Sequence, residues 1–174
     1  PDDLIVHLIA RHREIMRGRP DKLPGRWKTS GNQVGVYQFV EPDLVEGTLR
    51  KGLERIGRLP VGLPRALYVM LVVTEVHPFV DGNGRVARVM MNAELSHADM
   101  ARIVIPTVFR NEYLGGLRRV SVGDGDLAAF LKVMTYAWRW TAAMGWTDPE
   151  ATSGQLAATN ALYDSTDAAT SGIR

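Results

Sequence analysis

Residues 77–88 read HPFVDGNGRVAR. Pro78 disfavours the α conformation at His77, so a helix that approaches this segment should end there. Gly82 and Gly84 allow a tight turn and a close approach of the backbone to a ligand. Beyond the turn, apolar residues recur at roughly helical spacing and predict a new helix, at Val86, Val89, Met90 and Ala93. Residues 81–85 should therefore lie at a helix N-terminus, where free N–H groups attract anions.

Ionisable side chains surround this predicted turn. Arg85 and Arg88 are three residues apart, so they project from one face of the first helical turns. Asp81 precedes the helix, and His77 has an ordinary pKa of about 6.5, which suits a proton acceptor near neutral pH. The arrangement is typical of a site for an oligophosphate beside a general base. From the residues alone, a structural histidine, an N-cap aspartate and a solvated arginine face are the alternatives.

The segment resembles the signature of the Fic (Fido) family, His-Pro-Phe-x-Asp/Glu-Gly-Asn-Gly-Arg-x-x-Arg, and every specified position is matched. The resemblance covers residues 4–146 and implies an all-α fold, a Fic-type helical bundle with a small β-hairpin flap. It also implies a protein adenylyltransferase, which transfers AMP from ATP to a Ser, Thr or Tyr hydroxyl of a target protein. We expect residues 147–174 to form a C-terminal tail, or a linker to a missing downstream region.

The resemblance also implies roles for single residues. His77 would be the general base, and Asp81 would hold Mg²⁺, which prefers one or two carboxylates together with phosphate oxygens. The remaining positions would bind the nucleotide: Gly82, Asn83, Gly84 and Arg85 at the α- and β-phosphates, Arg88 at the outermost phosphate, and Arg110 and Tyr113 at the ribose and adenine. For Tyr113, core packing is an equal alternative. His7, His12 and His97 are expected to be surface or structural residues.

Composition excludes several classes of function. The 174 residues carry a net charge of only +2 and no run of Lys and Arg, so nucleic acid is not an expected partner. Cysteine is absent, which excludes disulfides and thiolate chemistry and suits a reducing cytoplasm. No apolar run is long enough to span a bilayer, so no membrane partner is expected.

The rest of the chain reads as helices separated by breakers. The first predicted helix runs from Asp2 to about residue 18, and the second begins at Pro42 with Leu44 on its apolar stripe. The next runs from Pro64 to Val76, and the helix that follows the signature turn ends at about residue 97. Further helices are predicted from Arg110 onward, over 127–144, and loosely over 155–162. Asp124 or Asp126 would cap the helix at 127–144. Between the first two helices, a β-prone run predicts a hairpin. The resemblance identifies this hairpin with the family's target-docking flap. Val34 and Val36 would pair with an extended target, and Arg26 and Lys28 would influence target choice.

Two functional alternatives stay open. One is a Fic-fold transferase of another phosphate-linked group, or an enzyme that removes AMP; the phosphorylating branch of the family lacks the first glycine of the loop, whereas Gly82 is present here. The other is a non-catalytic, nucleotide-dependent regulatory binding protein. The family's inhibitory Ser/Thr-x-x-x-Glu-Gly/Asn motif has only a near miss at Glu46. Control would then come from an upstream inhibitory helix or an antitoxin protein, and a homodimer is a further expectation.

Overall fold

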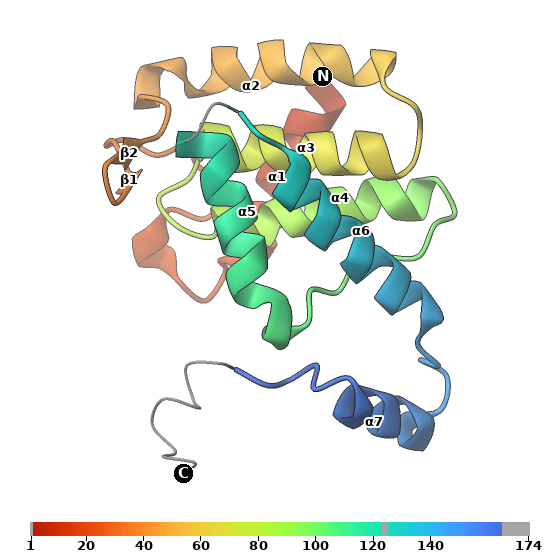
Figure 1. Cartoon of the computed structure of the whole chain (residues 1–174). Coiled ribbons are helices and arrows are strands. Elements are labelled where there is room, and N and C mark those ends of the chain that lie inside the picture. The colour runs from red at the N-terminus through yellow and green to blue at the C-terminus, as the bar shows by residue number, and fades with distance from the viewer. Residues whose placement is uncertain (1, 123–124, 165–174) are drawn as a thin grey trace. The chain divides into compact units, whose positions relative to one another are not determined.

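The computed structural model describes residues 2–122 and 125–164 (Figure 1). The chain forms two compact units, residues 1–100 and residues 101–174, and each is described here by itself. In the described ranges the secondary structure is helical apart from one two-stranded antiparallel hairpin. This confirms the all-α fold with a small β-hairpin that the sequence predicts. No helix in these ranges is long and apolar enough to cross a membrane.

The first unit contains four α-helices and the hairpin (Figure 1). Its elements are α1 (Asp2–Ile15), β1 (Gln33–Val34), β2 (Tyr37–Gln38), α2 (Val45–Leu53), α3 (Leu63–Val76) and α4 (Asn83–His97). Asp2 and Asp3 place negative charge in the first turn of α1, where the helix dipole favours it. Pro64 lies in the first turn of α3, where a missing N–H costs nothing.

The core of the first unit forms where α3 packs against α4, α1 packs against α4, and α2 packs against α3. As predicted, α3 is central, because apolar side chains cover most of its circumference. The buried side chains include Leu8, Met16, Leu49, Leu53, Leu67, Met70, Val73, Phe79, Met90, Met91 and Leu95. The loop from α3 to α4, which carries the signature, is thereby fixed on both sides by packed helices.

The hairpin pairs Gln33 with Gln38 and Val34 with Tyr37. Its two-residue turn consists of Gly35, with φ +60°, and Val36. A glycine at the first turn position suits the turn types that match the twist of two-residue hairpins. The hairpin prediction is therefore confirmed, although Val36 lies in the turn and not in a strand.

The helix predicted from Pro42 is less regular than expected. Residues Pro42–Leu44 form a 3₁₀ turn before α2, and Glu54–Arg58 form another after it. On the apolar stripe of this segment, Leu44 is 55% exposed, whereas the other residues are buried: Val45, Leu49, Leu53 and Ile56. The 3₁₀ turn has a different angular period from the α-helix, so it rotates Leu44 away from the stripe.

The second unit contains α5 (Arg110–Val122), α6 (Ala128–Ala143) and α7 (Pro149–Ala158), and α5 packs against α6. Asp126 accepts a hydrogen bond from the Ala128 N–H, as expected of a cap, whereas Asp124 lies outside the described residues. Helix α7 begins and ends earlier than predicted. Asp148 accepts hydrogen bonds from the N–H groups of Glu150 and Ala151, so it caps the helix at its start.

Candidate functional site

The signature begins where α3 ends. His77 follows the last helical residue with φ +51° and ψ +58°, and its N–H donates to the Val73 carbonyl. A left-handed conformation is uncommon for a residue with a large side chain, and such conformations persist where the surrounding structure holds them, often at functional sites. The predicted helix stop before Pro78 is therefore confirmed, and the stop turns the chain toward the loop.

The His77 ring is held by one hydrogen bond and one stacking contact. Its Nδ1 lies 3.1 Å from the Thr74 carbonyl oxygen, which can only accept, so Nδ1 carries the proton. In the neutral ring, Nε2 then has a free lone pair. The Phe39 ring stacks on the imidazole at a centroid distance of 3.8 Å and an angle of 16°. The tautomer and the orientation of His77 are thus both fixed.

The surroundings of His77 favour its neutral form. Burial lowers the pKa of His77 below its ordinary value of 6.5, and the nearby Lys28 ammonium lowers it further. The hydrogen bond to the Thr74 carbonyl and the Asp81 carboxylate oppose these effects without reversing them. A neutral imidazole with an unprotonated Nε2 can accept a proton from a hydroxyl at neutral pH.

Two asparagines clamp the peptide groups of Phe79. The Asn83 side chain accepts from the Phe79 N–H at 2.9 Å and donates to the Phe79 carbonyl at 2.8 Å. Asn32 donates to the same carbonyl at 3.0 Å. Because the Asn83 side chain is only 2% exposed and bonded at both ends, it shapes the loop, and its backbone N–H is the group left to face a ligand.

The glycine turn leads directly into α4. Gly82 has φ +78°, and an added Cβ would lie 2.8 Å from the Met16 sulfur and 3.2 Å from Nε2 of His12. Only glycine therefore fits this position. The first bond of the helical ladder runs from the Val86 N–H to the Gly82 carbonyl, so the N–H groups of residues 83–85 precede the ladder at the positive end of the helix dipole. This is the helix N-terminus that the sequence predicts.

Asp81 lies beside the same helix end. Its Oδ1 accepts the Gly82 N–H at 2.5 Å, and its Oδ2 lies 3.3 Å from Nη2 of Arg85. The Gly82 hydrogen bond chiefly, and also the Arg85 guanidinium, lower the pKa of Asp81. The described residues contain no group of three metal-ligating side chains. A single ionised and partly exposed carboxylate beside a helix N-terminus suits Mg²⁺, which takes its other ligands from phosphate and water.

Arg88 extends back along the helix toward the turn. A Cβ added at Gly84 would lie 3.4 Å from Nη1 of Arg88, so its guanidinium group lies against the turn. Arg85 is exposed and Arg88 half-buried. The structure therefore brings His77, Asp81, the turn and both arginines together within one unit.

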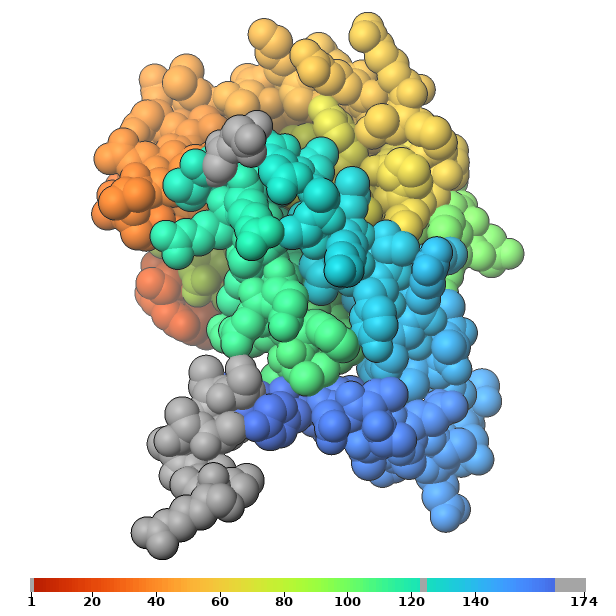
Figure 2. Space-filling view, viewed as in Figure 1, coloured from red at the N-terminus to blue at the C-terminus, as the bar shows by residue number. Residues whose placement is uncertain are grey.

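The hairpin is anchored beside His77. Tyr37 donates to the Glu75 carboxylate at 3.0 Å, and burial, together with this contact, raises the pKa of Tyr37 to about 12. The backbone carbonyl of Asn32 accepts from the Phe39 N–H at 3.1 Å, and this bond closes the base of the hairpin. At the tip, Val34 is 65% and Val36 is 89% exposed. Figure 2 shows this segment, in orange, at the surface of the first unit.

Lys28 departs from its predicted role in target choice. It is only 2% exposed, its Nζ donates to Oδ1 of Asn32 at 2.6 Å, and its backbone N–H donates to the Pro78 carbonyl at 2.9 Å. Burial lowers the pKa of Lys28. Lys28 therefore supports the signature loop from inside, whereas Arg26 is exposed.

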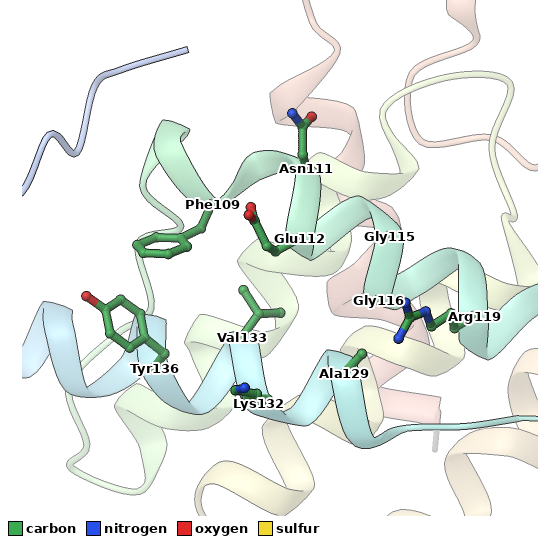
Figure 3. A pocket seen from close by; sticks show the side chains of 10 residues that line it. All are labelled: Phe109, Asn111, Glu112, Gly115, Gly116, Arg119, Ala129, Lys132, Val133 and Tyr136. Carbon is green, nitrogen blue, oxygen red and sulfur yellow. The ribbon is translucent and has the colours of Figure 1, made fainter. Parts of the chain in front are cut away.

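Arg110 and Tyr113 belong to the second unit, and their assignment to the nucleotide stays a prediction. A pocket of about 590 Å³ lies between α5 and α6 (Figure 3). Arg110, Tyr113 and Leu117 share one face of α5, and the pocket lies on the opposite face. Its lining residues are Phe109, Asn111, Glu112, Gly115, Gly116, Arg119, Ala129, Lys132, Val133 and Tyr136, so it contains none of the predicted site residues.

Comparison with protein families gives one result for the first unit. The model of the Fic/DOC family matches residues 4–95, which include the whole signature. Among curated proteins, the chain is 37% identical over 138 residues to protein adenylyltransferase Fic of Drosophila persimilis, a match that covers 74% of this chain and 26% of the relative. It is 27% identical over 124 residues to protein adenylyltransferase fic-1 of Caenorhabditis elegans, covering 69% of this chain and 24% of the relative. The chain thus spans about a quarter of the length of these relatives.

Solved structures show the same fold. Fic-1 of C. elegans superposes with a TM-score of 0.67 and 22% identity, covering 90% of this chain and 44% of that chain. A Fic-domain signaling protein from Bacteroides thetaiotaomicron superposes with a TM-score of 0.62 and 18% identity, covering 90% of this chain and 63% of that chain.

Proposed function

Because the chain belongs to the Fic/DOC family, we propose that it is a protein adenylyltransferase that transfers AMP from ATP to a Ser, Thr or Tyr hydroxyl of a target protein. The observation that carries the proposal is the state of His77. Its Nδ1–H is bound by the Thr74 carbonyl, so Nε2 is a proton acceptor held beside a helix N-terminus that can bind phosphate.

In the proposed reaction, Nε2 of His77 takes the proton of the target hydroxyl as its oxygen attacks the α-phosphorus of ATP. The new bond joins that oxygen to the α-phosphorus, and the bond from the α-phosphorus to the bridging oxygen breaks. Pyrophosphate leaves with the electron pair of that bond, and His77 afterwards returns its proton to solvent. Such a base contributes about 10²–10⁴ in rate.

The phosphates would lie on the turn and the two arginines. The backbone N–H groups of residues 83–85 and the Arg85 guanidinium would hold the α- and β-phosphates at the turn that Gly82 forms, and Arg88 would hold the outermost phosphate. Asp81 would hold Mg²⁺, and its lowered pKa keeps the carboxylate ionised as that role requires. When bound, the metal would neutralise charge on the leaving pyrophosphate. Arg110 and Tyr113 would border the ribose and adenine.

The target would dock on the flap. The exposed Val34 lies in β1, whose backbone groups would pair with an extended peptide, and the exposed Val36 lies beside it in the turn. Phe39 stacks on His77, so the same hairpin that would receive the target also orients the base. A cytoplasmic location and control by an antitoxin, an upstream helix or a homodimer belong to the same proposal.

The test follows the phosphorus atoms of ATP. The chain is incubated with a cell lysate and ATP labelled at either the α- or the γ-phosphorus. Above the label of the same lysate without the chain, we expect added label on protein from α-labelled ATP only. This added label should be lost in His77→Ala and retained in His97→Ala, which changes a histidine at the far end of α4. Added protein label from γ-labelled ATP would indicate a kinase, and ATP binding with no added label on any protein would favour a regulatory binder.

A further inference from the structure

His12 is a fully buried histidine that lies in α1, far from the signature in sequence. The sequence gives it no partner. In the structure its ring contacts two separate segments of the first unit, at Gly25 and at the signature loop. Its exposed fraction is 0%, so every polar atom of the ring must find its partner inside the protein.

The two ring nitrogens have different partners. The Gly25 N–H donates to Nδ1 at 3.0 Å, so Nδ1 is unprotonated. Nε2 lies 2.9 Å from the Asp81 carbonyl oxygen, which can only accept, so Nε2 carries the proton. This tautomer is the reverse of the one that Thr74 imposes on His77. A neutral imidazole satisfies both contacts of His12 at once.

The ring also packs tightly against the loop. It stacks on Phe79 at a centroid distance of 3.5 Å and an angle of 5°. Gly82 approaches so closely that an added Cβ would lie 3.2 Å from Nε2 of His12. The hydrogen bond to Asp81 is therefore made where the loop has no room to shift.

The bond to the Asp81 carbonyl sets the direction of the next N–H. In a trans peptide the carbonyl and the following N–H point in opposite directions. Since the Asp81 carbonyl points inward to His12, the Gly82 N–H points outward, where it donates to Oδ1 of Asp81. That contact in turn is the main reason for the lowered pKa of the Asp81 carboxyl.

We propose that His12 is a positioning residue for the nucleotide-binding turn, which orients the Asp81–Gly82 peptide and thereby aims the Asp81 carboxylate. The inference rests on the proposed function, because it assigns a purpose to that carboxylate. His12 itself touches no reacting atom. Losing a group that orients a metal ligand typically costs 10–100-fold in metal affinity, so its loss should weaken the Mg²⁺-dependent part of ATP binding by about tenfold or more.

Three substitutions separate the contacts of His12. His12→Phe keeps a ring against Phe79 and removes both hydrogen bonds. His12→Gln places an amide near Nε2, so it can still donate to the Asp81 carbonyl. His12→Asn places an amide near Nδ1, so it can still accept from Gly25. The matched control is His7→Phe, an exposed histidine on the same helix.

Calorimetry measures ATP binding with and without Mg²⁺. In His12→Phe and His12→Asn, we expect the increase in ATP affinity on adding Mg²⁺ to be about tenfold smaller than in the wild type. His12→Gln should keep most of this increase, and His7→Phe should match the wild type. A folded His12→Phe protein with the full gain would overturn the inference. So would equal rescue by Asn and Gln, because the Asp81 contact would then have no special role.

A second readout does not depend on nucleotide. Amide hydrogen exchange at Gly82 should be faster in His12→Phe and His12→Asn than in the wild type, and close to wild type in His12→Gln. If wild-type protein fails to bind ATP, the proposed function fails, while exchange at Gly82 still decides whether His12 positions the turn. If the variants do not fold, the wild-type ring decides: NMR should find Nε2 of His12 protonated, and a proton on Nδ1 would contradict the inference.

Discussion

The double hydrogen bond from Asn83 to Phe79 predicts that Asn83→Ala destabilises the fold. The substitution leaves the buried Phe79 N–H without its acceptor, which costs about 1–3 kcal/mol. The Phe79 carbonyl keeps its bond from Asn32, so the second loss is smaller, about 1 kcal/mol. We expect a total of about 2–4 kcal/mol in the free energy of unfolding. For a chain of this size that corresponds to a fall in Tm of roughly 5–15 °C.

The assay is urea and thermal unfolding, each followed by far-ultraviolet circular dichroism. Asn83→Asp keeps an acceptor for the Phe79 N–H and should lose clearly less stability than Asn83→Ala. Arg85→Ala is the matched control, because Arg85 lies two residues along the same turn and forms an exposed ion pair with Asp81. Such pairs contribute about 0–1 kcal/mol, so this variant should lose ATP affinity and keep its stability.

The reasoning is refuted if the free energy of unfolding of Asn83→Ala lies within about 0.5 kcal/mol of the wild-type value and the variant nevertheless loses ATP affinity. That result would mean that the Asn83 side chain contacts the nucleotide and leaves the loop to support itself.

Three further predictions concern acid, the outermost phosphate and the flap. The pKa values of His12 and His77 are lowered below 6.5 in the folded chain, so the unfolded chain takes up protons first as the pH falls. The free energy of unfolding should therefore be full above about pH 6.5 and decline below it. A urea midpoint that stays constant down to pH 5 would contradict this. Arg88→Ala should weaken binding of ATP more than of AMP in calorimetry, whereas equal losses would place Arg88 away from the outermost phosphate. Val34→Pro locks the backbone of an exposed strand residue and should reduce transfer to protein targets while ATP affinity stays unchanged; a folded variant with normal transfer would remove the flap from target docking.

Local rules predicted much of the fold correctly. Pro78 marks the end of α3, and the change to helical spacing after Gly84 marks α4. These features depend on neighbours in sequence, so pattern and propensity can reveal them. The exposure of Leu44 could not be predicted in this way, because a single 3₁₀ turn rotates its side chain out of the apolar stripe.

The supporting contacts of the site were not predictable, because they join residues distant in sequence. Asn32 reaches the Phe79 carbonyl, and His12 reaches the Asp81 carbonyl, across 47 and 69 positions. Neither residue shows a pattern that identifies its partner. Lys28 resembled a surface cation because charged residues are mostly exposed, yet the fold buries it against Asn32. The residues proposed to react thus lie in a compact motif, whereas their orientation depends on tertiary structure.

The central claim is that His77 presents an unprotonated Nε2 to its substrate. Long-range ¹H–¹⁵N correlation NMR of the folded wild-type chain at pH 7.5 reports which nitrogen of each ring carries the proton, and it needs neither target nor nucleotide. We predict a proton on Nδ1 and a bare Nε2 for His77, with the opposite pattern for His12. A His77 ring protonated on Nε2 could not accept the hydroxyl proton, and that result would contradict the account.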